Sequence, residues 1–355
     1  MKNIDRRKFL KITGSVAIGG LFLSVVGNGL WKMFTRPDKL FYGDRKDKGF
    51  DLVSDDGNFV SPYRRTFGFV APDEITAFDV EGGSIYIATP NNIYVYGLSG
   101  ELQTNFPVPS DLRDIALFDG KLFALFPTRI EVYDRDGEME RSWDACSENS
   151  DYCSLAVCGE GVFVTDAANK NICKYNIDGT LAKFINSPKG FVVPSYCFAI
   201  AVMDGKLFCS NPGRHQVEQY TLDGEFVTAF GKSGAGKGEF SGCCNPAIIT
   251  PANGGELLTS EKGVPRVSCY DKNGKFRSLL LDSKALGGGH KAYDVRVMKD
   301  KLIVAGGDKV SVFQYNKSKN QETECGRCDK ECPLKKTLSP SPLPSSRRAL
   351  RSVAS

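Results

Sequence analysis

The 355-residue chain has little histidine and little net charge, and each shortage excludes a class of function. Its two histidines, His215 and His290, are too few for a three-histidine zinc site. A formal net charge of +4 is small for this length, so the composition does not indicate a nucleic-acid-binding surface. No Cys-x-x-Cys-His haem motif occurs, and the absence of cysteine near the one long apolar run excludes a lipoprotein signal there. Cysteine itself is plentiful, with 12 residues that suit either disulfides or thiolate ligands to a metal.

The amino terminus resembles a twin-arginine export signal. The pair Arg6 and Arg7 is followed by Phe9, Leu10 and Lys11, and then by a glycine-rich apolar run. The resemblance implies recognition by the twin-arginine (Tat) translocon and delivery to the periplasm or another extracytoplasmic space. The run contains about 20 apolar residues, enough to span a bilayer. A soluble product and one tethered to the inner membrane by an uncleaved helix therefore both stay open.

A pattern of strand and turn recurs five times through the middle of the chain. An aromatic strand is followed each time by a turn, whose glycines are Gly100, Gly137, Gly179, Gly224 and Gly274. Asp-Gly and Asn-Gly between alternating apolar residues are a strong hairpin signal, because both turn positions need a positive φ. A second hairpin signal lies upstream of each turn, so that each unit contains four strands. Four-strand units every ~40–50 residues are typical of propeller blades.

The number of units predicts a closed ring of six blades. Five complete units begin near residues 75, 112, 153, 197 and 247, and a sixth, near residue 292, shows only three strands. Its fourth strand is expected from residues 64–70, because this pairing removes the sheet edges that an open array would expose. The sequence thus predicts an all-β, six-bladed β-propeller over residues 60–317. The flanking segments are predicted to be a signal or anchor (1–35), a linker (36–59) and a disordered, cysteine-containing tail (318–355).

Residues 211–246 resemble one NHL repeat. The segment that begins at Asn211, the Asp-Gly turn after it, and the glycine-rich stretch before Phe240 and Pro246 follow the pattern of that repeat. The stretch is not a phosphate-binding loop, because Gly238 stands where a Mg²⁺-binding Ser or Thr is needed and no helix is expected to follow. The resemblance implies a propeller that binds a protein or small-molecule ligand through a loop face or the channel mouth.

Five cysteines are placed near the starts of neighbouring inner strands. Cys153 and Cys197 each precede the first turn glycine of their unit by 8 residues, and Cys243 and Cys244 occupy a similar place in the fifth unit. Inner strands line the channel of a propeller, so these thiols are expected to approach one another at one mouth. One interpretation is a soft metal ion or iron–sulfur cluster, with four metal ligands: Cys146, Cys153, Cys197 and Cys244. The other is disulfides, such as Cys146–Cys153 with a second bridge among the remaining three.

A further cysteine group follows the predicted propeller. The spacing of Cys325, Cys328 and Cys332 resembles part of the bacterial ferredoxin run, which would make these residues cluster ligands; a small disulfide-bonded tail is the alternative. The remaining cysteines fall inside predicted strands, where each is interpreted as a small buried residue: Cys158, Cys173, Cys209 and Cys269.

These observations predict an exported binding or interaction module that carries an iron–sulfur or other thiolate-bound redox centre if the metal interpretation holds. The alternative is a metal-dependent hydrolase or lyase at the channel mouth, similar to six-bladed lactonases and amidating lyases. For that site the sequence offers Asp114, Asp294 and Asn245 near strand starts. It shows no pairing of nucleophile and base, and no catalytic residue is predicted.

Overall fold

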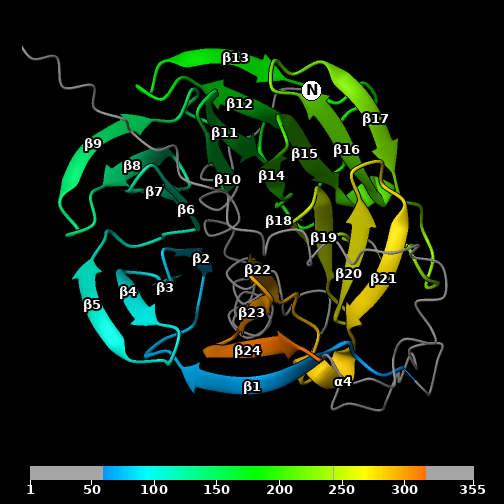
Figure 1. Ribbon diagram of the computed structural model, residues 1–355. Helices are drawn as coiled ribbons and strands as arrows, with labels where there is room; N and C mark the ends of the chain where they lie inside the picture. Colours follow the sequence, from blue (N-terminus) through cyan, green and yellow to red (C-terminus); the bar gives the residue numbers. More distant parts are fainter. Residues whose placement is uncertain (1–58, 243, 317–355) are drawn as a thin grey trace, which may run out of the picture. The chain divides into compact units, whose positions relative to one another are not determined.

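Each repeat unit folds into one antiparallel four-stranded sheet, and in five of the six sheets every strand pairs with the next along the chain. The computed structural model describes residues 59–242 and 244–316. In these ranges six such sheets are arranged radially around a central axis (Figure 1). This is the predicted all-β, six-bladed propeller, and the prediction of the fold is confirmed.

The blades follow one another along the chain. Blade 1 contains β2 (Ala77–Glu81), β3 (Ser84–Ala88), β4 (Asn92–Gly97) and β5 (Leu102–Pro107). Blade 2 contains β6 (Asp114–Phe118), β7 (Lys121–Phe126), β8 (Arg129–Tyr133) and β9 (Met139–Asp144). Blade 3 contains β10 (Tyr152–Cys158), β11 (Gly161–Asp166), β12 (Asn171–Tyr175) and β13 (Leu181–Ile185). Blade 4 contains β14 (Ile200–Met203), β15 (Lys206–Asn211), β16 (Gln216–Thr221) and β17 (Phe226–Phe230). Blade 5 contains β18 (Ile248–Ala252), β19 (Glu256–Glu261), β20 (Arg266–Asp271) and β21 (Phe276–Leu281).

Blade 6 closes the ring. Its first three strands are β22 (Asp294–Met298), β23 (Lys301–Gly306) and β24 (Lys309–Tyr315), and its outer strand is β1 (Tyr63–Val70). β1 pairs antiparallel with β24 along its length, and the rings of Tyr63 and Tyr315 meet edge to face at 5.5 Å. The prediction that residues before blade 1 complete the last blade is confirmed.

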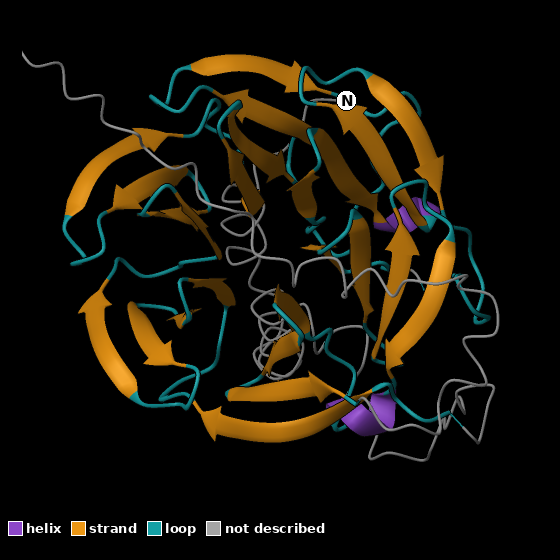
Figure 2. Ribbon diagram, viewed as in Figure 1, coloured by secondary structure: helices purple, strands orange, loops and turns teal. Residues whose placement is uncertain are grey.

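Helix is rare in the described residues (Figure 2). One 3-10 turn (η1, Pro212–Arg214) follows β15, and one short helix (α4, Ser283–Leu286) follows β21. The side chain of Asp282 caps α4 by accepting the backbone N–H of Ala285. Within residues 59–316, as far as they are described, no helix is long and apolar enough to cross a membrane.

The turn glycines of the repeat also allow neighbouring blades to approach closely. Gly179 has φ +92°, and a Cβ there would lie 2.8 Å from the Trp143 ring on the outer strand of the preceding blade. Gly274 has φ +78°, and a Cβ there would lie 2.2 Å from the Phe230 ring, which is also on the outer strand of the preceding blade. Glycine is therefore required twice at such a turn, once for the backbone conformation and once for the close approach of the next blade.

The apolar core is divided among the contacts between adjacent blades. One cluster fills each junction, for example around Tyr152 and Cys173 between blades 2 and 3, and around Cys153 and Cys209 between blades 3 and 4. Successive residues of a strand point to opposite faces of its sheet. Tyr152 and Cys153, the first two residues of β10, therefore contribute to different junctions.

Candidate functional site

The site with the most functional chemistry lies where the inner strands begin. The innermost strands β2, β6, β10, β14, β18 and β22 each contact the next around the ring, so their starts surround one mouth of the channel. Cys153 is the second residue of β10, and Cys197 lies three residues before β14. The two cysteines therefore come from adjacent blades.

The structure brings Cys153 and Cys197 together. The Cys197 thiol donates to the carbonyl oxygen of Cys153, with its Sγ 3.8 Å from that oxygen, and both residues line one depression. Cys153 is buried, with its Sγ 3.2 Å from the Thr165 hydroxyl, whereas Cys197 is exposed. One thiol of the pair is thus anchored in the blade while the other faces outward.

The electrostatic surroundings separate the two thiols. The neighbouring Cys153 side chain lowers the pKa of Cys197, and the cations Arg113 and Lys262 act in the same direction. Loss of hydration where Cys197 lies against the protein, and the carboxylate of Asp114, oppose this shift. Burial raises the pKa of Cys153 well above its ordinary value. Cys197 is therefore the member of the pair that becomes a thiolate first, and a thiolate is the nucleophilic and metal-binding form of cysteine.

An open depression of about 420 Å³ lies beside the pair. Its lining includes both apolar and charged groups: Glu74, Ile75, Leu112, Arg113, Cys153 and Cys197. Arg113 is fixed there by an ion pair with Asp151 at 2.6 Å and by donation to the carbonyl oxygen of Tyr152 at 2.8 Å. The depression thus offers a cation and two thiols to a ligand at the channel mouth.

Of the other predicted site residues, some are described and some fall outside the described ranges. Cys244 is half-buried and precedes Asn245, whose side chain is held by the backbone of Ser241 and Lys262. The predicted residues that fall outside the described ranges are Arg6, Arg7, Phe9, Leu10, Lys11, Cys243, Cys325, Cys328 and Cys332.

Sequence reasoning missed a charged network on the inner strands. Arg296 of β22 forms ion pairs with Asp294 at 2.5 Å and with Asp79 of β2 at 3.0 Å. Asp79 also accepts the backbone N–H of Leu117 on β6, at 2.8 Å. The network therefore links blades 6, 1 and 2 through side chains. Arg296 is the residue from which the sequence could have predicted this network, because an arginine inside a channel-facing strand needs acidic partners.

Asp114 continues this network from blade 2 to blade 3. Its Oδ2 accepts hydrogen bonds from the backbone N–H of Leu155 at 2.8 Å and from the Ser154 hydroxyl at 3.0 Å. Burial raises the pKa of Asp114 from 3.8 to about 7, although Arg296 and these hydrogen bonds act to lower it. Both carboxylates considered for a lactonase-like site are thus already engaged, Asp294 by Arg296 and Asp114 by the next blade.

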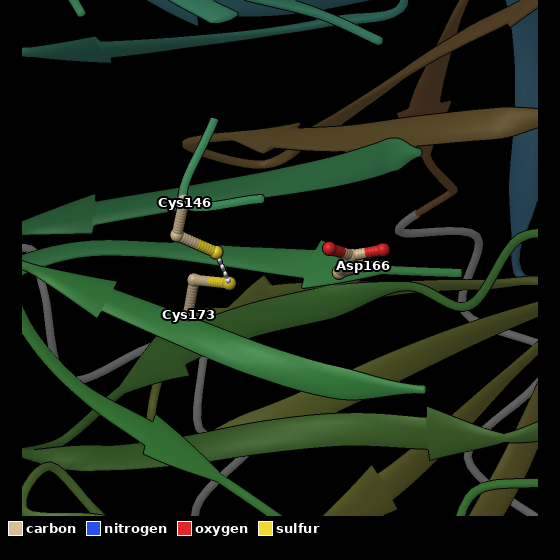
Figure 3. A group of neighbouring side chains, drawn as sticks. All are labelled: Cys146, Asp166 and Cys173. Carbon is tan, nitrogen blue, oxygen red and sulfur yellow. Dashed lines mark hydrogen bonds between the residues drawn. The ribbon is translucent and has the colours of Figure 1, made fainter. Parts of the chain in front are cut away.

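A second pair of cysteines lies away from the mouth, between blades 2 and 3. The Sγ atoms of Cys146 and Cys173 are 3.3 Å apart, and an oxygen of Asp166 completes a group whose ligand atoms all lie within 4.8 Å (Figure 3). Cys173 is fully buried, as its place inside a strand predicted, but its contact with Cys146 was not foreseen. Cys209 and Cys269 are also buried, and Cys158 is half-buried.

Comparison with known proteins establishes the fold alone. No protein-family model matches the chain, and no curated protein matches its sequence. An inactive variant of virginiamycin B lyase from Staphylococcus aureus is similar with a TM-score of 0.52 at 13% identity, covering 71% of this chain and 99% of that one. The Pan2 WD40 domain of Neurospora crassa is similar with a TM-score of 0.53 at 9% identity, covering 73% and 98%. A Bacteroides thetaiotaomicron protein of unknown function reaches 0.54 at 11% identity, covering 73% and 72%.

Proposed function

We propose that this protein is an exported binding module of the NHL-repeat type that holds a thiophilic ligand at its channel mouth through Cys197 and Cys153. The observation that carries the proposal is that Cys197 and Cys153 come from adjacent blades, line one depression, and are in contact, with the Cys197 Sγ 3.8 Å from the Cys153 carbonyl oxygen. A lone buried cysteine is usually a packing residue, but two thiols at an open depression form a chelating pair.

The depression supports the proposal in a second way. Arg113 lies in its wall beside the pair, held by Asp151, so a ligand with negative charge or a bound thiolate complex would meet a fixed cation. A fixed cation lowers the entropy lost when the ligand binds. The fold does not itself specify the ligand.

Cadmium ion is a suitable probe, because it binds thiolates and reports this by ultraviolet absorption. The titration is carried out in a background in which Cys146, Cys173, Cys325, Cys328 and Cys332 are replaced by serine, so that neither the second cysteine pair nor the cysteine group after the propeller can contribute. We expect one Cd²⁺ per chain to bind, and expect binding to be lost on adding either Cys153→Ser or Cys197→Ser. Cys158→Ser, on the same strand as Cys153, is the matched control and should bind normally. Binding that survives both substitutions at the mouth would reject the proposal.

An iron–sulfur cluster is a second candidate for the ligand; a cluster takes four protein ligands, of which Cys153 and Cys197 would supply two. Iron and acid-labile sulfide are measured on protein purified without oxygen. If both are present in the native chain and absent from Cys197→Ser, the site holds a cluster. If neither is present while Cd²⁺ still binds, the protein is a binding module without that cofactor.

A further inference from the structure

We propose that Cys146 and Cys173 form a disulfide bond that ties the connection before blade 3 to the third strand of that blade. Their Sγ atoms lie 3.3 Å apart although the residues are 27 positions apart in sequence. The bond length of a disulfide is about 2.05 Å, so a closing movement of about 1 Å is required. Cys146 lies in the connection between β9 and β10, outside any strand, and its sulfur points toward that of Cys173 (Figure 3).

Tyr152 holds Cys146 in position for this reaction. The tyrosine hydroxyl accepts the backbone N–H of Cys146 at 3.0 Å and donates to its Sγ at 3.4 Å. Tyr152 is fully buried, and its hydroxyl also contacts that of Tyr175 on β12. The loop sulfur is therefore fixed against the buried sulfur of Cys173 before any bond forms.

The carboxylate beside the pair is committed to another role. Asp166 Oδ1 accepts the backbone N–H groups of Asp151, Ala168 and Asn169, each at 3.1 Å. Its Oδ2 accepts the side-chain amide of Asn169 at 2.8 Å. Asp166 thus anchors the turn after β11, and using it as a metal ligand would compete with these bonds. Two sulfurs with no uncommitted third ligand suit a disulfide better than a metal ion.

The strand geometry also decides which cysteine is the partner. Tyr152, which holds Cys146, packs between blades 2 and 3, whereas Cys153 packs between blades 3 and 4. The sheet of blade 3 therefore separates Cys146 from Cys153. The pairing of those two residues, which the sequence suggested, is replaced by the pairing of Cys146 with Cys173.

The bond would form by thiol–disulfide exchange with an external disulfide oxidant. The Cys146 thiolate attacks one sulfur of the oxidant, which releases one oxidant thiol and leaves a mixed disulfide on Cys146. The Cys173 thiol, on losing its proton, then attacks the Cys146 sulfur and releases the second oxidant thiol. Two cysteines are oxidised and one disulfide is reduced to two thiols. The half-buried Cys146 is the accessible member, so the first attack falls to it.

Peptide mapping of the native chain tests the bond directly. The protein is oxidised with glutathione disulfide, its remaining thiols are alkylated, and it is digested without reductant. Trypsin releases Cys173 in peptide 171–174, and cleavage after Glu148 separates Cys146 from Cys153. We expect peptide 171–174 to be joined to the peptide that carries Cys146. Alkylated Cys173, a different partner, or one bound Zn²⁺ per chain lost in Cys173→Ser would overturn the proposal.

Thermal unfolding provides an independent measurement. A reductant should lower the melting temperature of the oxidised native chain by on the order of 5 °C, because the cross-link constrains the unfolded state. Cys146→Ser, Cys173→Ser and the double variant should each lose this response, whereas Cys158→Ser should keep it. An equal response in the double variant would assign the effect to another bond and contradict the proposal.

Discussion

Replacing Asp114 with asparagine should stabilise the protein at pH 8 and leave its stability almost unchanged at pH 4. Asparagine keeps an oxygen that can accept the hydrogen bonds from Leu155 and Ser154, but it removes an ionisable group from the inner wall of the channel. The prediction follows from the pKa of Asp114, which burial raises from 3.8 to about 7 in the folded protein.

The sign follows from proton binding. Between pH 4 and pH 7 the folded state keeps the proton on Asp114, while the unfolded state loses it. The free energy of unfolding therefore falls as the pH rises through this window, by about 1.4 kcal/mol per pH unit at most, and is constant above it. The difference in pKa corresponds to an upper limit of about 4 kcal/mol at pH 8, reduced by any water that solvates the carboxylate in the channel.

Denaturant unfolding of both proteins from pH 4 to pH 8 measures the effect, because titrations common to the two chains cancel in the difference. The advantage of Asp114→Asn should grow with pH up to about pH 7 and then level off. Ser154→Ala is a useful companion, since it removes a hydrogen bond that lowers the pKa of Asp114 and should shift the plateau to higher pH. A difference that is constant with pH would refute the reasoning.

Three further predictions address packing, reactivity and export. Gly179→Ala should lower the free energy of unfolding by about 3 kcal/mol, because left-handed backbone strain and overpacking against Trp143 add together. Gly190→Ala is the control: Gly190 has φ +74° but no atom within 4 Å, so strain alone should lower the free energy of unfolding by only about 1–2 kcal/mol. Arg113→Gln should raise the pKa of Cys197, so alkylation of that thiol by iodoacetamide at pH 7 should become slower; an unchanged rate would show that the arginine does not act on it. Changing the twin-arginine pair to lysines should retain the protein in the cytoplasm on cell fractionation, whereas normal export would indicate a different route.

The blades were predictable because their signals are local and repeated. Each turn glycine, such as Gly137, needs only its neighbours in sequence to be recognised, and all five that the sequence singled out have positive φ. The closing strand was predictable for a different reason. A three-stranded last unit leaves an open edge, and residues 64–70 were the one strand-like segment before blade 1.

The cysteine contacts were predictable only where the repeat fixed both partners. Cys153 and Cys197 have equal offsets from their turn glycines, so equivalent positions in adjacent blades could be inferred. Cys146 lies in a connection whose path the repeat does not determine, and Cys173 has the sequence context of any core residue. Their contact depends on how the connection folds back onto β12, and no periodic pattern records that.

The channel network and the mouth thiol are electrostatically coupled, and this joins two of the effects above. The Asp114 carboxylate raises the pKa of Cys197, while Arg113 lowers it. When Asp114 loses its proton near neutral pH, its negative charge therefore opposes ionisation of the Cys197 thiol. The same charge lowers the stability of the fold over the same pH range. Asp114→Asn should consequently increase both the stability of the protein and the reactivity of Cys197. Arg113→Gln removes a cation instead of an anion, so it should reduce reactivity without the gain in stability. Because coupled groups titrate as a unit, the comparison of these two variants, rather than either pKa alone, measures the coupling.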